Sequence, residues 1–219
     1  MNIKIPSLLA SLGLSFALIG CGAVTPNVGG AKAAAATNVA PENAATAIFA
    51  GGCFWCMEKP FDDIPGVISS TSGYTGGTTQ NPTYQQVGRG GTGHIEAVKI
   101  VYDPARVSYA QLLDTYWKQV DPFDSDGQFC DQGETYAPAI FVANPREQTA
   151  AEASKAAVAA RFPGQNVGVR IIAAKTFWDA EGYHQDYYLK NPVRYAYYRN
   201  GCGRDARLRA VWGADTSAH

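Results

Sequence analysis

Short runs of hydrophobic and alternating residues along the chain predict β-strands. They lie at residues 46–52, 67–74, 94–103, 138–143 and 169–174. Each run has the length of an ordinary strand, and several are rich in valine, isoleucine, threonine and aromatic residues. The first run stops at Gly51-Gly52, a pair that ends a strand. These runs therefore predict a sheet built from segments spread over most of the chain.

Helix-compatible segments lie between these runs. Residues 54–63 suit a helix that Pro60 would shorten or kink, and residues 108–119 form an amphipathic helix with Ser108 as a plausible N-cap. Asn144-Pro145 opens an Ala-rich helix reaching residue 162, and residues 74–93 form a Gly-rich loop. The alternation predicts an α+β fold, an α/β two-layer sandwich with a ferredoxin-like core. The Tyr-rich residues 177–203 should wrap it irregularly, as helix and coil.

The first part of the chain has a different pattern. One lysine is followed by an uncharged apolar run at residues 8–19, which is short for a membrane span but typical of a signal peptide. Leu18-Ile19-Gly20-Cys21 resembles a bacterial lipobox, in which Cys21 would carry the lipid. The alternative is an ordinary signal peptide cut within residues 31–36.

Four segments follow from this pattern. We expect a signal peptide at 1–20, a flexible lipid-anchored linker at 21–44, a folded domain at 45–205 and a C-terminal tail at 206–219. The expected location is outside the cytoplasm, as a membrane-anchored lipoprotein facing the periplasm or the cell exterior. The only expected membrane contact is this lipid anchor.

The charge and the cysteine content of the chain argue against two classes of protein. The formal net charge is −1 and 17% of residues are charged, so no basic surface for nucleic acid is expected. Five cysteines in 219 residues are too few for a disulfide scaffold. Nothing in the sequence requires more than a monomer.

The stretch GGCFWCMEK at residues 51–59 carries the first sign of chemistry. Cys53 follows a strand and two glycines and lies where a helix begins, a position that favours a thiolate and lowers a cysteine pKa. The glycines allow a sharp turn that leaves the sulfur accessible. The alternative is a buried structural cysteine, which the Gly-Gly pair and Cys56 make the weaker interpretation.

A second sign of chemistry lies in the run at residues 94–103. Period-two alternation places Glu96 on one face with Val98 and Ile100, whereas Lys99 marks the more exposed face. A carboxyl group in apolar surroundings stays protonated near neutral pH and can act as a general acid. The alternative is a buried glutamate in a salt bridge.

These motifs together resemble a known family. GGCFWCME, GYTGGTTQNPTYQQVGRGGTGHIEAVKIVYDP, DQGETYAPAIF and the terminal aromatic region are similar to A-type peptide methionine sulfoxide reductases over residues 46–200. The resemblance implies an enzyme that reduces methionine-S-sulfoxide, free or in proteins, to methionine.

The resemblance also implies residue roles. Cys53 would attack the sulfoxide sulfur and become a sulfenic acid, and Glu96 would protonate the oxygen. Phe54 and Trp55 would form the aromatic pair that binds the methyl group of the substrate. Tyr84 and Tyr136 would be the two phenols that hydrogen-bond to the sulfoxide oxygen, and Asp131 would be an acidic residue that lines the pocket. A neutral acid and two hydroxyl donors suit an oxygen that gains negative charge, and an indole face suits a methyl group with partial positive charge.

Turnover requires a second thiol and an external reductant. We favour Cys56 as the resolving cysteine, one helical turn from Cys53, then Cys202, with Cys130 as a third candidate. The chain departs from the best-known family arrangement at two places: it has GCFWC in place of GCFWG, and the tail around Cys202 is atypical. The reductant would be thioredoxin or a similar dithiol, and no bound cofactor is expected.

Several other interpretations stay open. A zinc site from Cys53, Cys56, Cys130 and Cys202 lacks a second paired spacing, so no metal is expected. GRGGTG at residues 88–93 precedes a strand, unlike a dinucleotide-binding loop, and His184 suits a hydrogen-bonded role. A general thiol-disulfide oxidoreductase using Cys53 and Cys56 and an anchored, non-catalytic binding module are the alternative functions.

Overall fold

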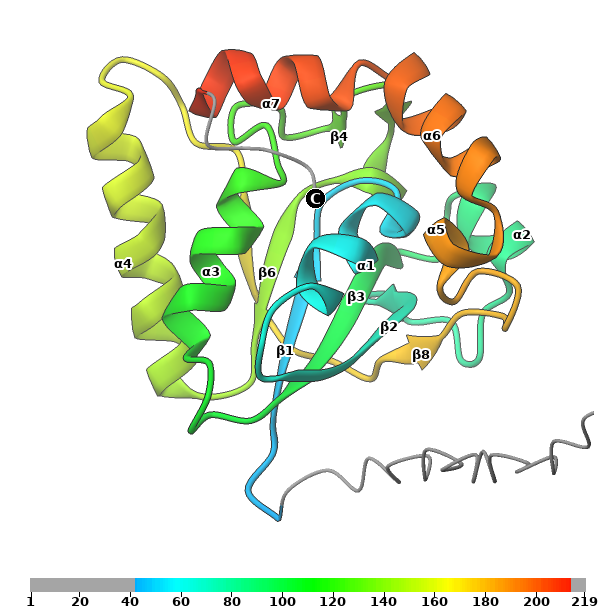
Figure 1. The fold of residues 1–219 in the computed structure, drawn as a ribbon, viewed down its shortest axis with the longest axis horizontal. Coiled ribbons are helices and arrows are strands. Elements are labelled where there is room, and N and C mark those ends of the chain that lie inside the picture. Colours follow the sequence, from blue (N-terminus) through cyan, green and yellow to red (C-terminus); the bar gives the residue numbers. More distant parts are fainter. Residues whose placement is uncertain (1–41, 214–219) are drawn as a thin grey trace, which may run out of the picture. The chain divides into compact units, whose positions relative to one another are not determined.

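A six-stranded mixed sheet forms the centre of the computed structural model, which describes residues 42–213 (Figure 1). The strand order is β7-β6-β1-β3-β2-β8, and every neighbouring pair is antiparallel except β6 and β7. The strands are β1 (Ala45–Ala50), β2 (Val67–Thr75), β3 (Ile95–Tyr102), β6 (Ala139–Val142), β7 (Arg170–Ala173) and β8 (Trp178–Asp179). A separate two-stranded ribbon pairs β4 (Gly127–Gln128) with β5 (Asp131–Gln132).

Helices follow most of these strands. They are α1 (Phe54–Asp62), α2 (Tyr84–Gly88), α3 (Tyr109–Lys118), the 3₁₀ turn η1 (Glu134–Tyr136), α4 (Pro145–Arg161), α5 (Tyr187–Lys190), α6 (Pro192–Gly201) and α7 (Arg204–Trp212). Across residues 42–213, none of them has the length and apolar character that a membrane crossing needs.

The central elements have the order of a ferredoxin-like fold. Strand β1, helix α1, strands β2 and β3, helix α3 and strand β6 follow one another along the chain, and the four strands lie in the order β6-β1-β3-β2. This is the split βαβ arrangement. The predicted α+β sandwich with a ferredoxin-like core is therefore confirmed.

The two faces of the sheet are covered differently. Phe49 of β1 packs against Phe61 of α1 and Tyr116 of α3, with ring centroids 5.5 and 5.1 Å apart. The opposite face buries a smaller cluster around Ile95, against which Phe177 of the segment before β8 packs. The face of the sheet that α1 and α3 cover therefore holds the main core.

Local sequence signals explain the helix boundaries. The side chain of Ser108 caps α3 and that of Asn144 caps α4, as predicted. Helix α1 contains Pro60 and ends two residues after it. Thr83 forms a capping box with Gln86, so the Gly-rich loop contains the short helix α2, which the glycine content had hidden.

The C-terminal region contains three helices: α5 and α6 lie in the part of the chain expected to be helix and coil, and α7 lies beyond it. Leu208 and Trp212 of α7 are buried, and the Trp212 indole donates a 2.9 Å hydrogen bond to the Val120 carbonyl. Residues 206–213 had been assigned to a tail, so the packed domain extends past the expected boundary at 205. The expected signal peptide, Cys21 and most of the linker lie outside the described residues.

Candidate active site

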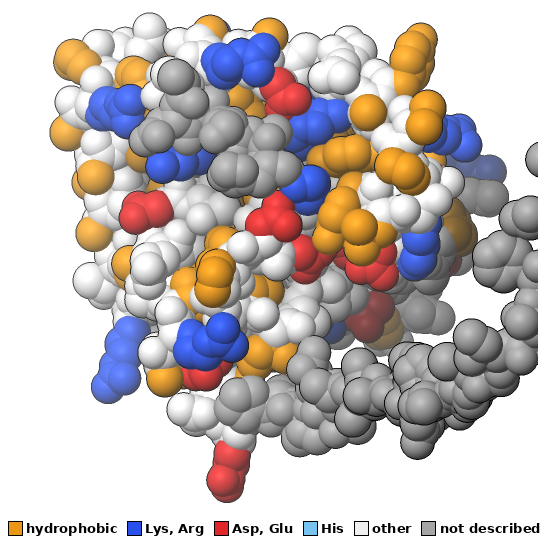
Figure 2. Space-filling model, viewed as in Figure 1, with side chains coloured by type: hydrophobic (Ala, Val, Ile, Leu, Met, Phe, Trp, Pro, Cys, Tyr) orange, Lys and Arg blue, Asp and Glu red, His pale blue; other side chains and the backbone are white. Residues whose placement is uncertain are grey.

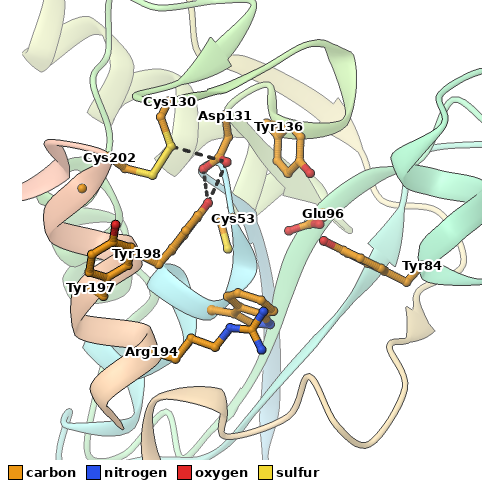
Figure 3. A pocket seen from close by; sticks show the side chains of 12 residues that line it. Cys53, Tyr84, Glu96, Cys130, Asp131, Tyr136, Arg194, Tyr197, Tyr198 and Cys202 are labelled. Carbon is orange, nitrogen blue, oxygen red and sulfur yellow. Dashed lines mark hydrogen bonds between the residues drawn. A yellow bond between two sulfur atoms is a disulfide. The ribbon is translucent and has the colours of Figure 1, made fainter. Parts of the chain in front are cut away.

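The end of β1 brings Cys53 to a cavity of about 560 Å³ (Figure 3). Gly52 has a φ of +81°, and a Cβ on Gly51 would lie 2.7 Å from Met57 Sδ, so the turn before Cys53 needs both glycines. Cys53 is the N-cap residue of α1 but makes no capping hydrogen bond with its side chain. Its sulfur is therefore not used to cap the helix, and the residue is only 6% exposed.

Residues from distant parts of the chain line this cavity with Cys53. Those named by the sequence analysis are Trp55, Tyr84, Glu96, Cys130, Asp131, Tyr136 and Cys202, and those it did not name are Arg194, Tyr197, Tyr198 and Gly201. Two predicted residues, Phe54 and Cys56, are buried and do not line the cavity. The fold thus brings most of the predicted site residues together.

Glu96 lies deep in the cavity, as its position on the buried face of β3 predicted. It is 2% exposed, and its Oε2 accepts a 3.0 Å hydrogen bond from the Phe54 amide at the start of α1. Burial raises the Glu96 pKa to about 8, and the amide hydrogen bond opposes this shift. At neutral pH the carboxyl is therefore mostly protonated and can donate a proton.

Two phenols face the same space. Tyr84 comes from α2 and Tyr136 from η1, and their hydroxyl groups point into the cavity near Glu96 (Figure 3). Burial raises the pKa of Tyr84 to about 12 and also raises that of Tyr136. Both hydroxyl groups are therefore protonated at neutral pH and can donate hydrogen bonds to a ligand oxygen.

Trp55 forms the aromatic wall of the cavity. Its ring stacks on Tyr187 at 3.7 Å between centroids, and its Nε1 donates a 2.9 Å hydrogen bond to His184 Nδ1. His184 is thus an orienting partner of Trp55. Phe54 does not line the cavity, but its ring packs against those of Tyr84 and His184 and so supports two residues of the site.

Asp131 on the opposite wall is held by a residue that the sequence analysis did not name. The Tyr198 hydroxyl donates to the two carboxylate oxygens of Asp131 at 2.6 Å each. Burial raises the Asp131 pKa, and the Tyr198 hydrogen bond opposes the shift. The only sequence signal for Tyr198 is its place among the Tyr-rich residues 177–203, which predicted a segment that wraps the domain.

The four cysteines of the described domain fall into two pairs. Cys130 and Cys202 form a disulfide across 72 residues of sequence, whereas Cys53 and Cys56 are free and buried. A four-cysteine zinc site does not fit this state, because two of its sulfurs are bonded to each other.

The predicted lowering of the Cys53 pKa is wrong for the folded protein. Burial raises the Cys53 pKa, and the hydrogen bond with Cys56 and the carboxyls of Glu96 and Asp131 raise it further. The first amide of α1 is already occupied by Glu96. The hydrogen bond from Cys53 instead lowers the Cys56 pKa to about 7, and two arginines, Arg204 and Arg199, contribute.

Charges of both signs are interspersed on the face shown in Figure 2, in keeping with the small net charge. The large exposed hydrophobic side chains within residues 42–213 are Tyr183, Leu189, Val193 and Tyr197. Tyr197 is among the residues that line the cavity.

Comparison with known proteins places this site in a family. The family model for peptide methionine sulfoxide reductase matches residues 45–216. A peptide methionine sulfoxide reductase MsrA 2 from Caulobacter vibrioides is 49% identical over 180 residues, covering 82% of this chain and 91% of that protein. The MsrA of Bacillus subtilis is 48% identical, covering 77% of this chain and 96% of that protein.

A solved structure supports the same assignment. Methionine sulfoxide reductase A of Corynebacterium diphtheriae is 33% identical with a TM-score of 0.63, covering 71% of this chain and 78% of that chain. The chain belongs to the peptide methionine sulfoxide reductase family.

Proposed function

We propose that this chain reduces methionine-S-sulfoxide, free or within proteins, to methionine, with Cys53 as the nucleophile. One observation supports this most strongly: the cavity joins a thiol to the buried carboxyl of Glu96, whose pKa burial raises, and to the indole of Trp55. Sulfoxide reduction needs a sulfur nucleophile, a proton for the departing oxygen and an apolar contact for the methyl group.

The first step transfers oxygen from substrate to enzyme. The Cys53 sulfur attacks the sulfoxide sulfur while Glu96 protonates the oxygen, and the Tyr84 and Tyr136 hydroxyls stabilise the charge developing there. The substrate S–O bond breaks, an S–O bond forms on Cys53, and methionine leaves. The proton of the Cys53 thiol restores Glu96, so the balance is one thiol and one sulfoxide giving one sulfenic acid and one thioether.

The second stage regenerates the thiol. The Cys56 thiolate attacks the sulfur of the Cys53 sulfenic acid, and the hydroxyl leaves as water after protonation. The resulting Cys53–Cys56 disulfide is reduced by thioredoxin or a similar dithiol, which supplies two electrons. No bound cofactor takes part. Cys130 and Cys202 stay bonded to each other and act structurally.

A two-epimer assay tests this proposal. The wild-type protein and Cys53→Ser are incubated with the S and R epimers of dabsyl-methionine sulfoxide under dithiothreitol. We expect the wild type to reduce the S epimer alone and the variant to reduce neither. Insulin reduction that persists in Glu96→Gln, with no sulfoxide reduction by the wild type, would instead identify a general thiol-disulfide oxidoreductase.

We also propose that the protein is exported, anchored through Cys21 and monomeric. The apolar run at residues 8–19 and the lipobox-like sequence support export, and disulfides such as Cys130–Cys202 persist in oxidising compartments. Palmitate labelling that is lost in Cys21→Ala would support the anchor; unchanged labelling would contradict it.

A further inference from the structure

Arg204 is a fully buried cation directly beneath the Cys53–Cys56 segment. It is the first residue of α7 and is 1% exposed. Its Nη2 donates to the Gly51 carbonyl at 2.9 Å and to the Gln119 carbonyl at 2.8 Å, and lies 3.0 Å from Met57 Sδ. The guanidinium therefore contacts the chain on both sides of the segment that carries the two free thiols.

Arg204 forms no ion pair with a carboxylate within residues 42–213, although its charge opposes the rise in the Asp131 pKa. Two nearby arginines differ in this respect: Arg199 pairs with Asp205 at 2.7 Å, and the half-exposed Arg207 pairs with Asp121 at 2.6 Å. Arg204 has carbonyl oxygens, a thioether and the ring of Phe129, whose centroid lies 4.6 Å from its guanidinium carbon. A buried charge without a counterion is costly, so an anion that forms beside it is stabilised.

Cys56 is the group beside Arg204 that can become this anion. It is 2% exposed, and Arg204 contacts its neighbour Met57 directly. The hydrogen bond from Cys53 lowers its pKa, as do Arg204 and Arg199, whereas burial and Asp131 raise it. The titratable and charged groups that act on Cys56 or respond to it are Cys53, Glu96, Asp131, Tyr195, Arg199 and Arg204.

We propose that Arg204 is a positioning residue for turnover, which stabilises the Cys56 thiolate and so provides the nucleophile that resolves oxidised Cys53. This inference rests on the proposed function for the role of Cys56. In the step that Arg204 assists, the Cys56 thiolate forms an S–S bond with Cys53, the S–O bond of the sulfenic acid breaks, and the hydroxide takes one proton to become water.

The Cys130–Cys202 disulfide holds Arg204 in place. Cys202 lies two residues before Arg204, and Gly203 between them has a φ of +68°, which makes the turn from α6 into α7. Its partner Cys130 follows Phe129, whose ring covers the guanidinium. The disulfide thus joins the two segments that enclose the buried cation.

A thiolate titration tests the proposal independently of sulfoxide reduction. Cys53→Ser keeps a hydroxyl donor beside Cys56 and leaves Cys56 as the free thiol of the described domain. The rate of iodoacetamide alkylation is measured against pH in this background, with Arg204→Gln, Arg204→Lys and Arg207→Gln added in turn. Circular dichroism confirms that each variant is folded.

We expect Cys56 to react as a thiolate near pH 7. Arg204→Gln should slow alkylation at pH 7 about fivefold, which corresponds to a rise of about one unit from a Cys56 pKa of about 7. Arg204→Lys should recover most of the rate, and Arg207→Gln, which changes an exposed and paired arginine of the same helix, should not alter it. An unchanged profile in folded Arg204→Gln, or an equal shift in Arg207→Gln, would overturn the proposal.

A second measurement tests the proposal if the Arg204→Gln variant does not fold. If Arg204→Gln is unfolded, the pH profile of alkylation in the Cys53→Ser variant alone decides. An alkylation rate that rises only above pH 9, as for an ordinary buried thiol, would overturn the role of Arg204. Donor-driven turnover that persists in Cys56→Ser would refute the resolving role in the proposed function. It would leave the titration result intact, so the two failures are distinguishable.

Discussion

The two cysteine pairs of the domain have different surroundings, although Cys53, Cys130 and Cys202 all line the same cavity. Cys53 and Cys56 are buried, free and one helical turn apart, with Glu96 near the first and two guanidinium groups near the second. Cys130 and Cys202 are more exposed, and a disulfide joins them. These differences in bonding and in nearby charge are the basis on which we propose that the first pair reacts and that the second is structural.

Among substitutions in the two cysteine pairs, replacement of Cys53 should have the largest effect on activity. Cys53→Ser should reduce methionine-S-sulfoxide reduction to the detection limit with any reductant, because no other thiol of the domain faces Glu96. The matched control is the double variant Cys130→Ser/Cys202→Ser, which should still reduce the sulfoxide in a single turnover. Loss of the single turnover in a folded double variant would show that the second pair takes part in the chemistry.

Replacing Cys56 should divide the reaction into its two stages. Cys56→Ser should release about one methionine per enzyme and then stop with a thioredoxin-type donor, because the sulfenic acid on Cys53 has no resolving thiol. Quenched-flow measurement of methionine, with dithiothreitol and with the donor, checks this. Sustained donor-driven turnover at the wild-type rate is the contrary outcome, and would make Cys202 the next candidate.

Glu96 should have the next largest effect. Glu96→Gln removes the proton donor and should lower the rate of the first step by about 10²–10⁴-fold. The Glu96 pKa of about 8 also predicts a pH profile. Wild-type activity that needs the protonated form is present below pH 8 and falls as pH rises through this value, whereas the Gln variant should lack this alkaline fall. An identical alkaline fall in both proteins would assign it to another group.

Removing the disulfide should affect stability more than the first chemical step. Its 72-residue separation predicts a loss of about 2–4 kcal/mol in the free energy of unfolding for Cys130→Ser/Cys202→Ser, measured by urea denaturation. The rate of oxygen transfer should change less than tenfold, since Glu96 and Cys53 lie on other elements. Unchanged stability would mean that the disulfide does not hold the C-terminal helices to the ribbon.

Much of the fold could be predicted from local patterns. Strand periodicity placed Glu96 on the buried face of β3, and Ser108 and Asn144 marked helix starts, because these signals lie within a few residues. Helix α2 was missed among glycines, although the capping box of Thr83 and Gln86 was readable in the sequence.

Most of the candidate site came from the family resemblance, and the rest depends on tertiary contacts. The Cys130–Cys202 pairing and the position of Arg204 join segments far apart in the chain, so no spacing indicates them. The Cys53 pKa was mispredicted because burial and nearby carboxyls outweigh the helix N-terminus, and burial is a property of the folded chain.

Disulfide mapping after one reaction cycle tests the central claim most directly. The enzyme is reacted with one equivalent of methionine-S-sulfoxide without reductant, alkylated, digested and analysed by mass spectrometry. We predict a new Cys53–Cys56 disulfide beside an intact Cys130–Cys202 disulfide. A linkage from Cys53 to Cys202 or Cys130, with Cys56 alkylated, would contradict the division of the four cysteines into a reacting and a structural pair.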